Sequence, residues 1–347
     1  MGCPVGDFNV LQIHPTRRCN LRCHHCYSSS APNERDSLSL AILQGALSDA
    51  RAEGFDVVSI SGGEPLLYSD LPKLLESACQ EGFQTSITTN GILLNKQRLA
   101  ALRDHLHLVA ISLDGIPSSH NRVRNSPRAF EQMAANLVQL RNSGIPFGFI
   151  FTLTQFNLDE LEWVTEFAIQ QKARLLQIHP LDETGRAAER MVGAAPDKME
   201  LAYAFLESAR LQAEAPDSLL IHLDVIEIDY VRENPHRFYA KSLPEDPTTI
   251  PFTEIVSPLV IEPDGTISPV QYGFAPQFTI GNLHAVNLAQ ALNEWKATKA
   301  RVFTDMAKEV HRRIKKPCKT PFVYWYTLLN EQANRYVLNT TPILRGK

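Results

Sequence analysis

The sequence predicts an α/β fold built on parallel strands, and three observations predict it. Six strand patterns alternate with helical patterns along residues 8–181. The strand patterns are rich in Val, Ile, Leu and Phe, as strands buried on both faces of a sheet are. Several helical patterns end in glycine just before the next strand, which is typical of parallel βα units. Six units are too few for a closed eight-stranded barrel, so a doubly wound sheet and an open partial barrel both remain.

Each unit begins with a strand pattern and continues with a helical one. We expect strands at 8–14, 56–62, 83–89, 107–113, 146–154 and 173–181. Between them, apolar residues recur every three or four positions, the period of an amphipathic helix. We therefore expect helices at 39–54, 70–82, 95–105, 128–144 and 158–172.

The pattern changes after about residue 215. Residues 216–256 include a segment rich in proline and polar residues, and we interpret them as a linker. "SPLVIEPDGTISPV" (257–270) predicts a hairpin, because two alternating runs flank the turn sequence Pro263-Asp264-Gly265. Helical patterns follow at about 287–301, 302–315 and 322–338. The expected domains are thus a large α/β domain at 1–215 and a small C-terminal α+β domain at 257–347.

The composition is that of an ordinary globular protein. Of the 347 residues, 44% are hydrophobic and 21% are charged, and the net charge is −4. The densest basic stretch, "HRRIKK" (311–316), is interpreted as a solvated helix end, so we expect no nucleic-acid partner. No apolar run approaches the roughly 18–20 residues that span a bilayer, and the N-terminus has no signal-peptide pattern. We expect a cytoplasmic protein without a membrane segment, with reduced thiols.

Three of the six cysteines, Cys19, Cys23 and Cys26, lie within eight positions. They follow the first strand in a loop at its carboxyl end, the edge at which α/β folds place their chemistry. A zinc site completed by His24 or His25 is one interpretation, and three unligated buried thiols are another. The third is a [4Fe–4S] cluster, in which three thiolates leave one iron open to a small-molecule ligand. The spacing favours the cluster.

Short motifs follow the next three strands. "SGGEP" (61–65) supplies paired glycines, which let the backbone approach a ligand closely, and Glu64 is an acceptor for a cationic amine. "TTNG" (88–91) and "SLDG" (112–115) supply small polar side chains suited to ribose or carboxylate contacts. Each motif alone is an ordinary βα turn. In this order behind a loop with three cysteines, they are hard to explain as turns alone.

Together these motifs resemble those of the radical S-adenosylmethionine (SAM) enzymes, over about residues 8–190. "HNRVRNSPRAF" (120–130), "FTLTQFNLDEL" (151–161) and "GRA" (185–187) add to the resemblance. It is closest to the subgroup with a C-terminal SPASM or twitch extension, which includes many peptide-maturing enzymes. The resemblance implies an open partial (β/α)6 barrel with a C-terminal extension of a hairpin plus helices. It also implies one [4Fe–4S] cluster and SAM, whose reductive cleavage would give a 5′-deoxyadenosyl radical that removes a substrate hydrogen.

The resemblance also implies a role for each matching residue. Cys19, Cys23 and Cys26 would ligate the cluster. The residues that would bind SAM are His25, Gly62, Gly63, Glu64, Pro65, Asn90, Ser112, Asp114, Arg124 and Gln177. His25 and Gln177 would lie near the adenine, and the "GGEP" backbone with Glu64 would hold the methionine amine. Ser112 and Arg124 would contact the ribose and the carboxylate, which arginine can bind bidentately.

The C-terminal extension departs from the SPASM pattern. Val270 stands where the family has a cysteine after Pro269, and only Cys318 follows downstream. We interpret the extension as a SPASM-like scaffold without auxiliary clusters. Without that acceptor for a second electron, epimerisation, fragment excision or rearrangement fits better than net oxidation. Cys318 is the candidate thiol for returning a hydrogen atom. The aromatic run "FVYWY" (322–326) is interpreted as core rather than as a substrate platform.

The expected function is a radical SAM enzyme that modifies a ribosomally synthesised peptide. A separate small leader-peptide-binding protein is the expected partner, because the first strand begins by about residue 8. An external electron donor of the flavodoxin or ferredoxin type is also implied. A small-molecule substrate, namely a sugar, an amino acid or a tetrapyrrole, is the alternative within this chemistry. A zinc-stabilised binding protein is the alternative from another class.

Overall fold

A curved, mostly parallel sheet organises the chain, and the computed structural model describes residues 8–314 and 321–340. The strands of this sheet are β1 (Val10–Ile13), β2 (Val57–Ile60), β3 (Gln84–Thr89), β4 (Leu108–Ser112), β5 (Phe147–Leu153), β6 (Leu175–Pro180), β7 (Leu220–Leu223), β9 (Leu259–Ile261), β10 (Thr266–Pro269) and β11 (Gly281–Asn282). Their order is β11-β10-β9-β1-β2-β3-β4-β5-β6-β7, and β1 to β7 pair in parallel. A separate pair joins β8 (Ile226–Glu227) to β12 (Phe322–Val323).

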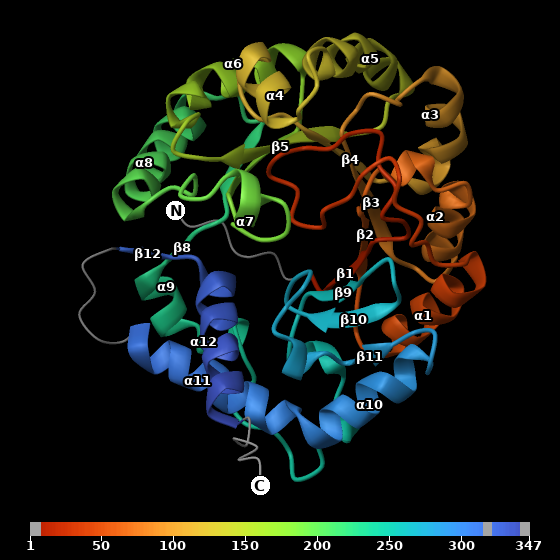
Figure 1. Ribbon diagram of the computed structural model, residues 1–347, viewed down its shortest axis with the longest axis vertical. Coiled ribbons are helices and arrows are strands. Elements are labelled where there is room, and N and C mark those ends of the chain that lie inside the picture. Colours follow the sequence, from red (N-terminus) through yellow and green to blue (C-terminus); the bar gives the residue numbers. More distant parts are fainter. Residues whose placement is uncertain (1–7, 315–320, 341–347) are drawn as a thin grey trace, which may run out of the picture.

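Helices cover the outer face of the sheet, so that the molecule forms an open ring with strands inside and helices outside (Figure 1). The helices are α1 (Leu40–Ala52), α2 (Leu71–Gln80), α3 (Lys96–Leu102), α4 (Pro117–Val123), α5 (Ala129–Ser143), α6 (Leu161–Gln171), α7 (Ala187–Arg190), α8 (Lys198–Glu214), α9 (Ile228–Glu233), α10 (Leu288–Thr298), α11 (Ala300–Ile314) and α12 (Trp325–Thr340). The predicted α/β fold is confirmed. No helix in the described ranges is long and apolar enough to cross a membrane.

The strand β6 has one apolar and one polar face. Leu176 and Ile178 are fully buried in the core, whereas Gln177 and His179 are half-buried and line a cavity. The prediction of strands that are apolar on both faces is therefore wrong for β6. Side chains alternate along a strand, and the second face of β6 lines this cavity.

Residues 216–256, which we expected to be a linker, contain elements of the fold instead. They include β7, which adds a seventh parallel strand beside β6, and also β8 and α9. The strand was missed because it is four residues long and carries a polar His222 between Ile221 and Leu223. Such a short mixed run gives no clear periodic signal.

The predicted hairpin is confirmed as β9 and β10, which pair around the turn at Pro263-Asp264-Gly265. Because β9 also pairs in parallel with β1, the extension continues the same sheet. The predicted helices at 287–301, 302–315 and 322–338 correspond to α10, α11 and α12. The C-terminal extension therefore closes one side of the ring (Figure 1).

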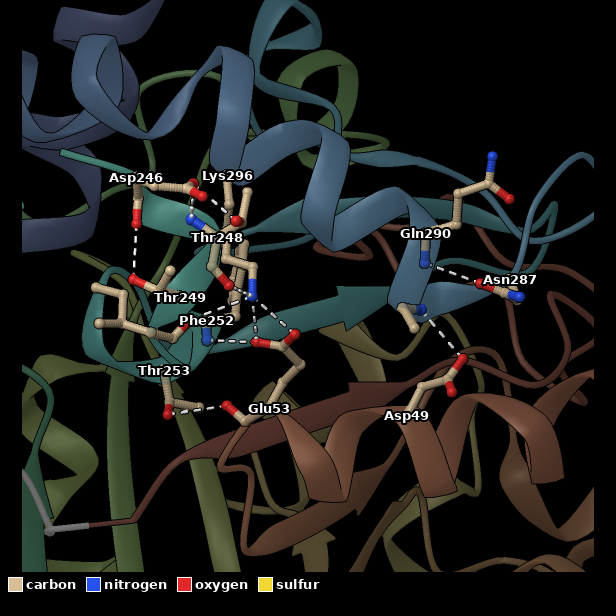
Figure 2. A network of polar contacts seen from close by, with 12 residues as sticks. Asp49, Glu53, Asp246, Thr248, Thr249, Phe252, Thr253, Asn287, Gln290 and Lys296 are labelled. Atoms are coloured by element: carbon tan, nitrogen blue, oxygen red, sulfur yellow. Dashed lines mark hydrogen bonds and ion pairs between the residues drawn. The ribbon is translucent and has the colours of Figure 1, made fainter. Parts of the chain in front are cut away.

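A buried ion pair fastens this extension to the barrel (Figure 2). Lys296 on α10 is 2% exposed and donates from Nζ to both carboxylate oxygens of Glu53, at 2.8 and 2.9 Å. Glu53 follows α1 and also accepts a hydrogen bond from the backbone N–H of Phe252. The same Nζ donates to the carbonyls of Thr248 and Ile250. Satisfied in this way, a buried charge pair fixes the relative position of the two elements.

Candidate functional site

The cysteine loop, residues 15–38, connects β1 to α1 and crosses the inside of the ring (Figure 1). Cys19 and Cys23 are buried and pack with Leu21, while Cys26 is half-buried against them. The backbone N–H of Cys19 donates to the carbonyl of Ala31, which holds the two sides of the loop together. The structure thus brings the three predicted ligands to one place at the carboxyl end of β1.

The cysteine loop offers three thiols to a metal group. The thiols of Cys19, Cys23 and Cys26 are near enough to influence one another electrostatically. In a [4Fe–4S] cube each thiolate binds a different iron, so three thiolates leave the fourth iron open. This donor set fits such a cube.

Burial controls the protonation of two of the thiols, Cys19 and Cys23. It raises the pKa of Cys19 to about 12 and that of Cys23 to about 11, although Arg124 opposes the rise at Cys23. Both are therefore neutral thiols at pH 7 in the protein alone. Because only the thiolate is a metal ligand, loading of the site must release these protons.

Two glycines of "SGGEP" pack closely against the backbone of the cysteine loop. A Cβ on Gly63 would lie 2.3 Å from the carbonyl oxygen of Arg18, and Gly62 has a φ of +110°. The N–H of Gly63 donates to the carbonyl of Thr16. We predicted that these glycines let the backbone approach a ligand, and the close approach that the structure shows is to the cysteine loop itself.

Glu64 is fully buried and accepts three hydrogen bonds from its own chain. Its Oε1 accepts from the hydroxyl of Thr89 at 2.7 Å and from the N–H of Leu66, and its Oε2 accepts from the N–H of Asn90. A carboxylate can accept about four hydrogen bonds, so one position on Oε2 remains for the predicted amine. The neighbouring Pro65 begins a short 3-10 turn, in the position where proline is favoured.

A buried ion pair joins two other predicted residues. Arg124 donates from Nε to Oδ2 of Asp114 at 2.5 Å, and its Nη1 lies 3.9 Å from the sulfur of Cys23. Burial alone would raise the pKa of Asp114, but Arg124 lowers it overall. Asp114 lies two residues after Ser112, the last residue of β4. The pair therefore connects the end of β4 to the cysteine loop.

His25 and Asn90 lie beside these groups. The Nε2 of His25 is 3.7 Å from Asp114, its Nδ1 is buried without a partner, and burial lowers its pKa to about 4. It is therefore a neutral ring with a free nitrogen. The amide of Asn90 donates to Asn20 in the cysteine loop. Both residues stay predicted SAM contacts.

Two predicted residues lie elsewhere. Gln177 is on the inner face of β6, where its amide donates to both carboxylate oxygens of Asp224. Its predicted place near an adenine stays a prediction. Cys318, the predicted hydrogen donor, lies outside the described residues.

Arg186 is a site residue to which the sequence assigned no role, although "GRA" was noted. Its guanidinium donates to the carbonyls of Cys23, Ser29 and Ser30 at 2.7–2.8 Å. Its backbone N–H donates to the carbonyl of Cys26. The side chain is buried. Arg186 therefore acts as a clamp on the cysteine loop from the segment after β6.

A second missed feature is a group of three rings between β1, the cysteine loop and the C-terminal extension. His14 stacks on Tyr272 with ring centroids 5.1 Å apart, and Tyr27 lies 5.8 Å from His14. Both ring nitrogens of His14 are buried without partners, and burial lowers its pKa to about 3. A neutral buried imidazole beside Gly62 thus keeps two hydrogen-bonding positions open.

Comparisons with known proteins agree with this geometry. The family model described as the radical SAM superfamily matches residues 13–168. Fe-coproporphyrin III synthase of Methanosarcina barkeri is 30% identical over 182 residues, which cover 52% of this chain and 46% of that protein. PqqA peptide cyclase of Ruegeria pomeroyi is 30% identical over 228 residues, which cover 63% of this chain and 59% of that protein. The chain thus spans only about half the length of the curated relatives it matches.

Solved structures share the fold. SuiB of Streptococcus suis bound to its precursor peptide SuiA has a TM-score of 0.62 at 17% identity, over 84% of this chain and 65% of that one. The enzyme anSMEcpe with bound AdoMet and the Cp18Cys peptide has a TM-score of 0.62 at 17% identity, over 95% of this chain and 98% of that one. At these identities the likeness concerns the fold, including the C-terminal extension.

Proposed function

Because residues 13–168 match the radical SAM superfamily, we propose that this chain is an enzyme that reductively cleaves SAM and removes a hydrogen atom from a peptide. The observation that carries the proposal is the gathering of Cys19, Cys23 and Cys26 beside the buried pair of Asp114 and Arg124. The [4Fe–4S] cluster and SAM that the family implies would supply the one-electron chemistry.

The residues of the chain have distinct tasks in this proposal. Cys19, Cys23 and Cys26 would hold the cluster, and Arg186 keeps their loop in place from outside. Arg124 supplies a fixed positive charge at Cys23, which favours the thiolate over the thiol. The position left on Glu64 would accept from the amino group of SAM. Apart from Cys26, which is half-buried, these groups are buried and shielded from water.

A ribosomally synthesised peptide is the substrate class that we favour. The alignment with PqqA peptide cyclase covers 63% of this chain, against 52% for Fe-coproporphyrin III synthase. The modification would be epimerisation, fragment excision or rearrangement. The partners would be a separate small leader-peptide-binding protein and an electron donor of the flavodoxin or ferredoxin type.

A small-molecule substrate is the second candidate, and the name of the relative Fe-coproporphyrin III synthase favours it. A cavity of about 640 Å³ beside β6, β7 and α8 has room for either a peptide segment or a small molecule. Incubation with SAM, a reductant and either peptides encoded by neighbouring genes or iron tetrapyrroles that could be converted to iron coproporphyrin separates the two. Product formed only from the peptide supports our proposal, and product formed only from a tetrapyrrole contradicts the peptide assignment.

The chemistry itself is tested by reconstitution without oxygen. We expect about four irons and four sulfides per chain, and formation of 5′-deoxyadenosine and methionine when SAM and dithionite are added. Cys23→Ala should abolish both the brown colour and SAM cleavage. Cys79→Ala, which removes a free thiol on α2, is the matched control and should change neither. A colourless wild-type protein, or full turnover by Cys23→Ala, would refute the ligand assignment.

A further inference from the structure

The cavity of about 640 Å³ contains a group of polar side chains that the proposed chemistry does not use. It lies between β6, β7, α8 and the β8–β12 pair, and Figure 1 shows that pair between α8 and α9. Its polar wall comes from β6 and β7, and Tyr324 and Tyr326 also line it. The prediction that the run 322–326 is core is thus wrong in part, since only Trp325 is fully packed inside.

Strand register places this wall next to the predicted SAM contacts. Ser112 on β4 pairs with Ile150 on β5, Ile150 pairs with Gln177 on β6, and Gln177 pairs with His222 on β7. These residues form one row on the inner face of the ring. Since neighbouring strands lie about 4.8 Å apart, β4 and β6 are separated by roughly 10 Å along the row. A substrate in the cavity would therefore be close to any ligand held at Ser112.

A continuous chain of hydrogen bonds lies beside this row and joins Tyr324, His179 and Asp224. The phenol of Tyr324 lies 3.2 Å from Nε2 of His179, and Nδ1 of His179 lies 2.8 Å from Oδ2 of Asp224. Asp224 is held from its other sides by Gln177 and by His222, whose Nε2 is 3.1 Å from Oδ1. Asp224 is thus fixed by several donors, and His179 is fixed between Asp224 and Tyr324.

The charges of this chain favour a protonated imidazole and a protonated phenol. Burial lowers the pKa of His179, but its hydrogen bond to Asp224 and the charges of Asp224 and Asp182 raise it overall. Burial and the same two carboxylates raise the pKa of Tyr324 well above its usual value. The other titratable groups that line the cavity are His222, Tyr326, Tyr230 and Glu227.

A metal site does not explain the cluster. Among the residues that the structure describes, no three His, Cys, Asp or Glu side chains could hold a metal ion. A purely structural network does not explain it either, because 39% of the side-chain surface of His179 is open, and the residue lines the cavity. A phenol backed by an imidazole and a carboxylate, facing a cavity, is an arrangement suited to donating an oriented hydrogen bond to a ligand.

We propose that Tyr324 binds a carbonyl group of the substrate in this cavity by donating a hydrogen bond from its phenol to the carbonyl oxygen, with His179 and Asp224 as the residues that orient the phenol. The protonated Nε2 of His179 donates to the phenol oxygen, and its Nδ1–H donates to Asp224, so that a relay of hydrogen bonds runs from Asp224 to the substrate. No covalent bond breaks in this contact, and no electron is transferred. The substrate class rests on the proposed function.

The first test measures the relay by NMR on the full-length protein, labelled with ¹⁵N-histidine and kept without oxygen. The His179 signal is assigned by its loss in His179→Gln. We expect a His179 pKa above the ordinary value of about 6.5 in the wild type, and a value below it in Asp224→Asn, because burial then acts with less opposition. Equal His179 pKa values in the two proteins would overturn the relay. If Asp224→Asn does not fold, Tyr324→Phe replaces it, and an unchanged Nε2 shift would overturn the relay.

The second test uses N-acetylglycine N-methylamide, a peptide-bond mimic, as the probe. Titration should shift the His179 signal of the wild type, and Tyr324→Phe should weaken binding about fivefold through loss of one hydrogen bond. Tyr203→Phe removes the hydroxyl of an exposed tyrosine on α8 that does not line the cavity, and it should bind like the wild type. Equal affinities in Tyr324→Phe and the wild type would overturn the proposal. Absence of a cluster or of 5′-deoxyadenosine would instead contradict the proposed function, since neither NMR measurement depends on SAM cleavage.

Discussion

Arg124 and Asp114 form a buried ion pair, with Nε of Arg124 2.5 Å from Oδ2 of Asp114. Asp114 follows β4, and Arg124 follows the last residue of α4, ten residues later in the chain. The pair therefore closes the connection between strand and helix, and it presents the guanidinium to the sulfur of Cys23. One contact thus contributes both to the fold of the barrel and to the charge at the cysteine loop.

The first prediction concerns the cost of breaking this pair. Asp114→Asn leaves Arg124 buried without its carboxylate, so we expect the free energy of unfolding at pH 7 to fall by about 3–5 kcal/mol in urea denaturation. Asp305→Asn breaks an exposed pair with Lys308 on α11 and should cost no more than about 1 kcal/mol. An equal decrease in the free energy of unfolding of the two variants would show that the buried pair stabilises the fold no more than the exposed pair does.

The pH dependence of this difference follows from the pKa of Asp114. Burial opposes the charged form, but Arg124 and His25 lower the pKa of Asp114 overall. A carboxyl group with a lowered pKa contributes stability above its unfolded value, and that stability is lost as the pH falls toward the folded value. We therefore expect the difference in free energy of unfolding between the wild type and Asp114→Asn to be constant from pH 7 to about pH 4. Below pH 4 this difference should become smaller. Urea denaturation at pH 7, 4 and 3 measures the difference, and widening on acidification would contradict the assignment.

The second prediction concerns the glycine that carries the cysteine loop. In Gly63→Ala the new Cβ would lie 2.3 Å from a backbone oxygen of Arg18, so the loop must move, and we expect fewer irons bound per chain after reconstitution. Gly45→Ala is the matched control, because nothing lies within 4 Å of its Cβ position in α1. It should keep the full iron content and gain about 0.5–1 kcal/mol of stability. Wild-type iron content in Gly63→Ala would refute the close-packing argument.

The third prediction concerns Arg186, which holds three carbonyls of the cysteine loop. Arg186→Ala leaves these acceptors unpaired, so we expect the variant to lose iron to a chelator faster than the wild type. The decrease of absorbance near 400 nm measures this loss. Arg190→Ala changes an exposed arginine one turn further along α7 and should lose iron at the wild-type rate. If both variants lose iron equally fast, Arg186 is not the clamp.

The fourth prediction concerns the attachment of the C-terminal extension in Figure 2. Lys296→Met leaves the carboxylate of Glu53 partly buried without its cation, so we expect loosening at the boundary between α1 and α10. Hydrogen exchange should become faster in residues 246–254 and in α10, both of which contact this pair. Lys308→Met, on the exposed surface of α11, should leave that exchange unchanged. Unchanged exchange in Lys296→Met would show that apolar packing alone holds the extension.

Local signals explain what the sequence could predict. The spacing of Cys19, Cys23 and Cys26 and the paired glycines lie within single loops, so their meaning is readable from short stretches. The same holds for the turn at residues 263–265 and for the helices of the extension, whose periodicity is local. The β6 sequence "LLQIHP" also shows its polar inner face, as a period of two that we did not use.

Tertiary contacts explain what the sequence could not predict. His179 meets Asp224 from 45 residues away and Tyr324 from 145 residues away, and no local pattern marks these three as partners. Arg186 stood in a noted motif, but its acceptors are more than 150 residues earlier in the chain, as for Ser30 at a separation of 156. In "FVYWY" no local pattern tells Trp325, which enters the core, from Tyr324 and Tyr326, which line the cavity.

The most direct test of the central claim is electron paramagnetic resonance of the reduced, reconstituted protein with and without SAM. A cluster held by only three thiolates has one iron free to bind SAM, so we predict a single reduced cluster whose signal changes shape when SAM is added. Loss of that signal in Cys19→Ala, and its retention in Cys79→Ala, would tie it to the cysteine loop. A signal that SAM leaves unchanged would contradict the account.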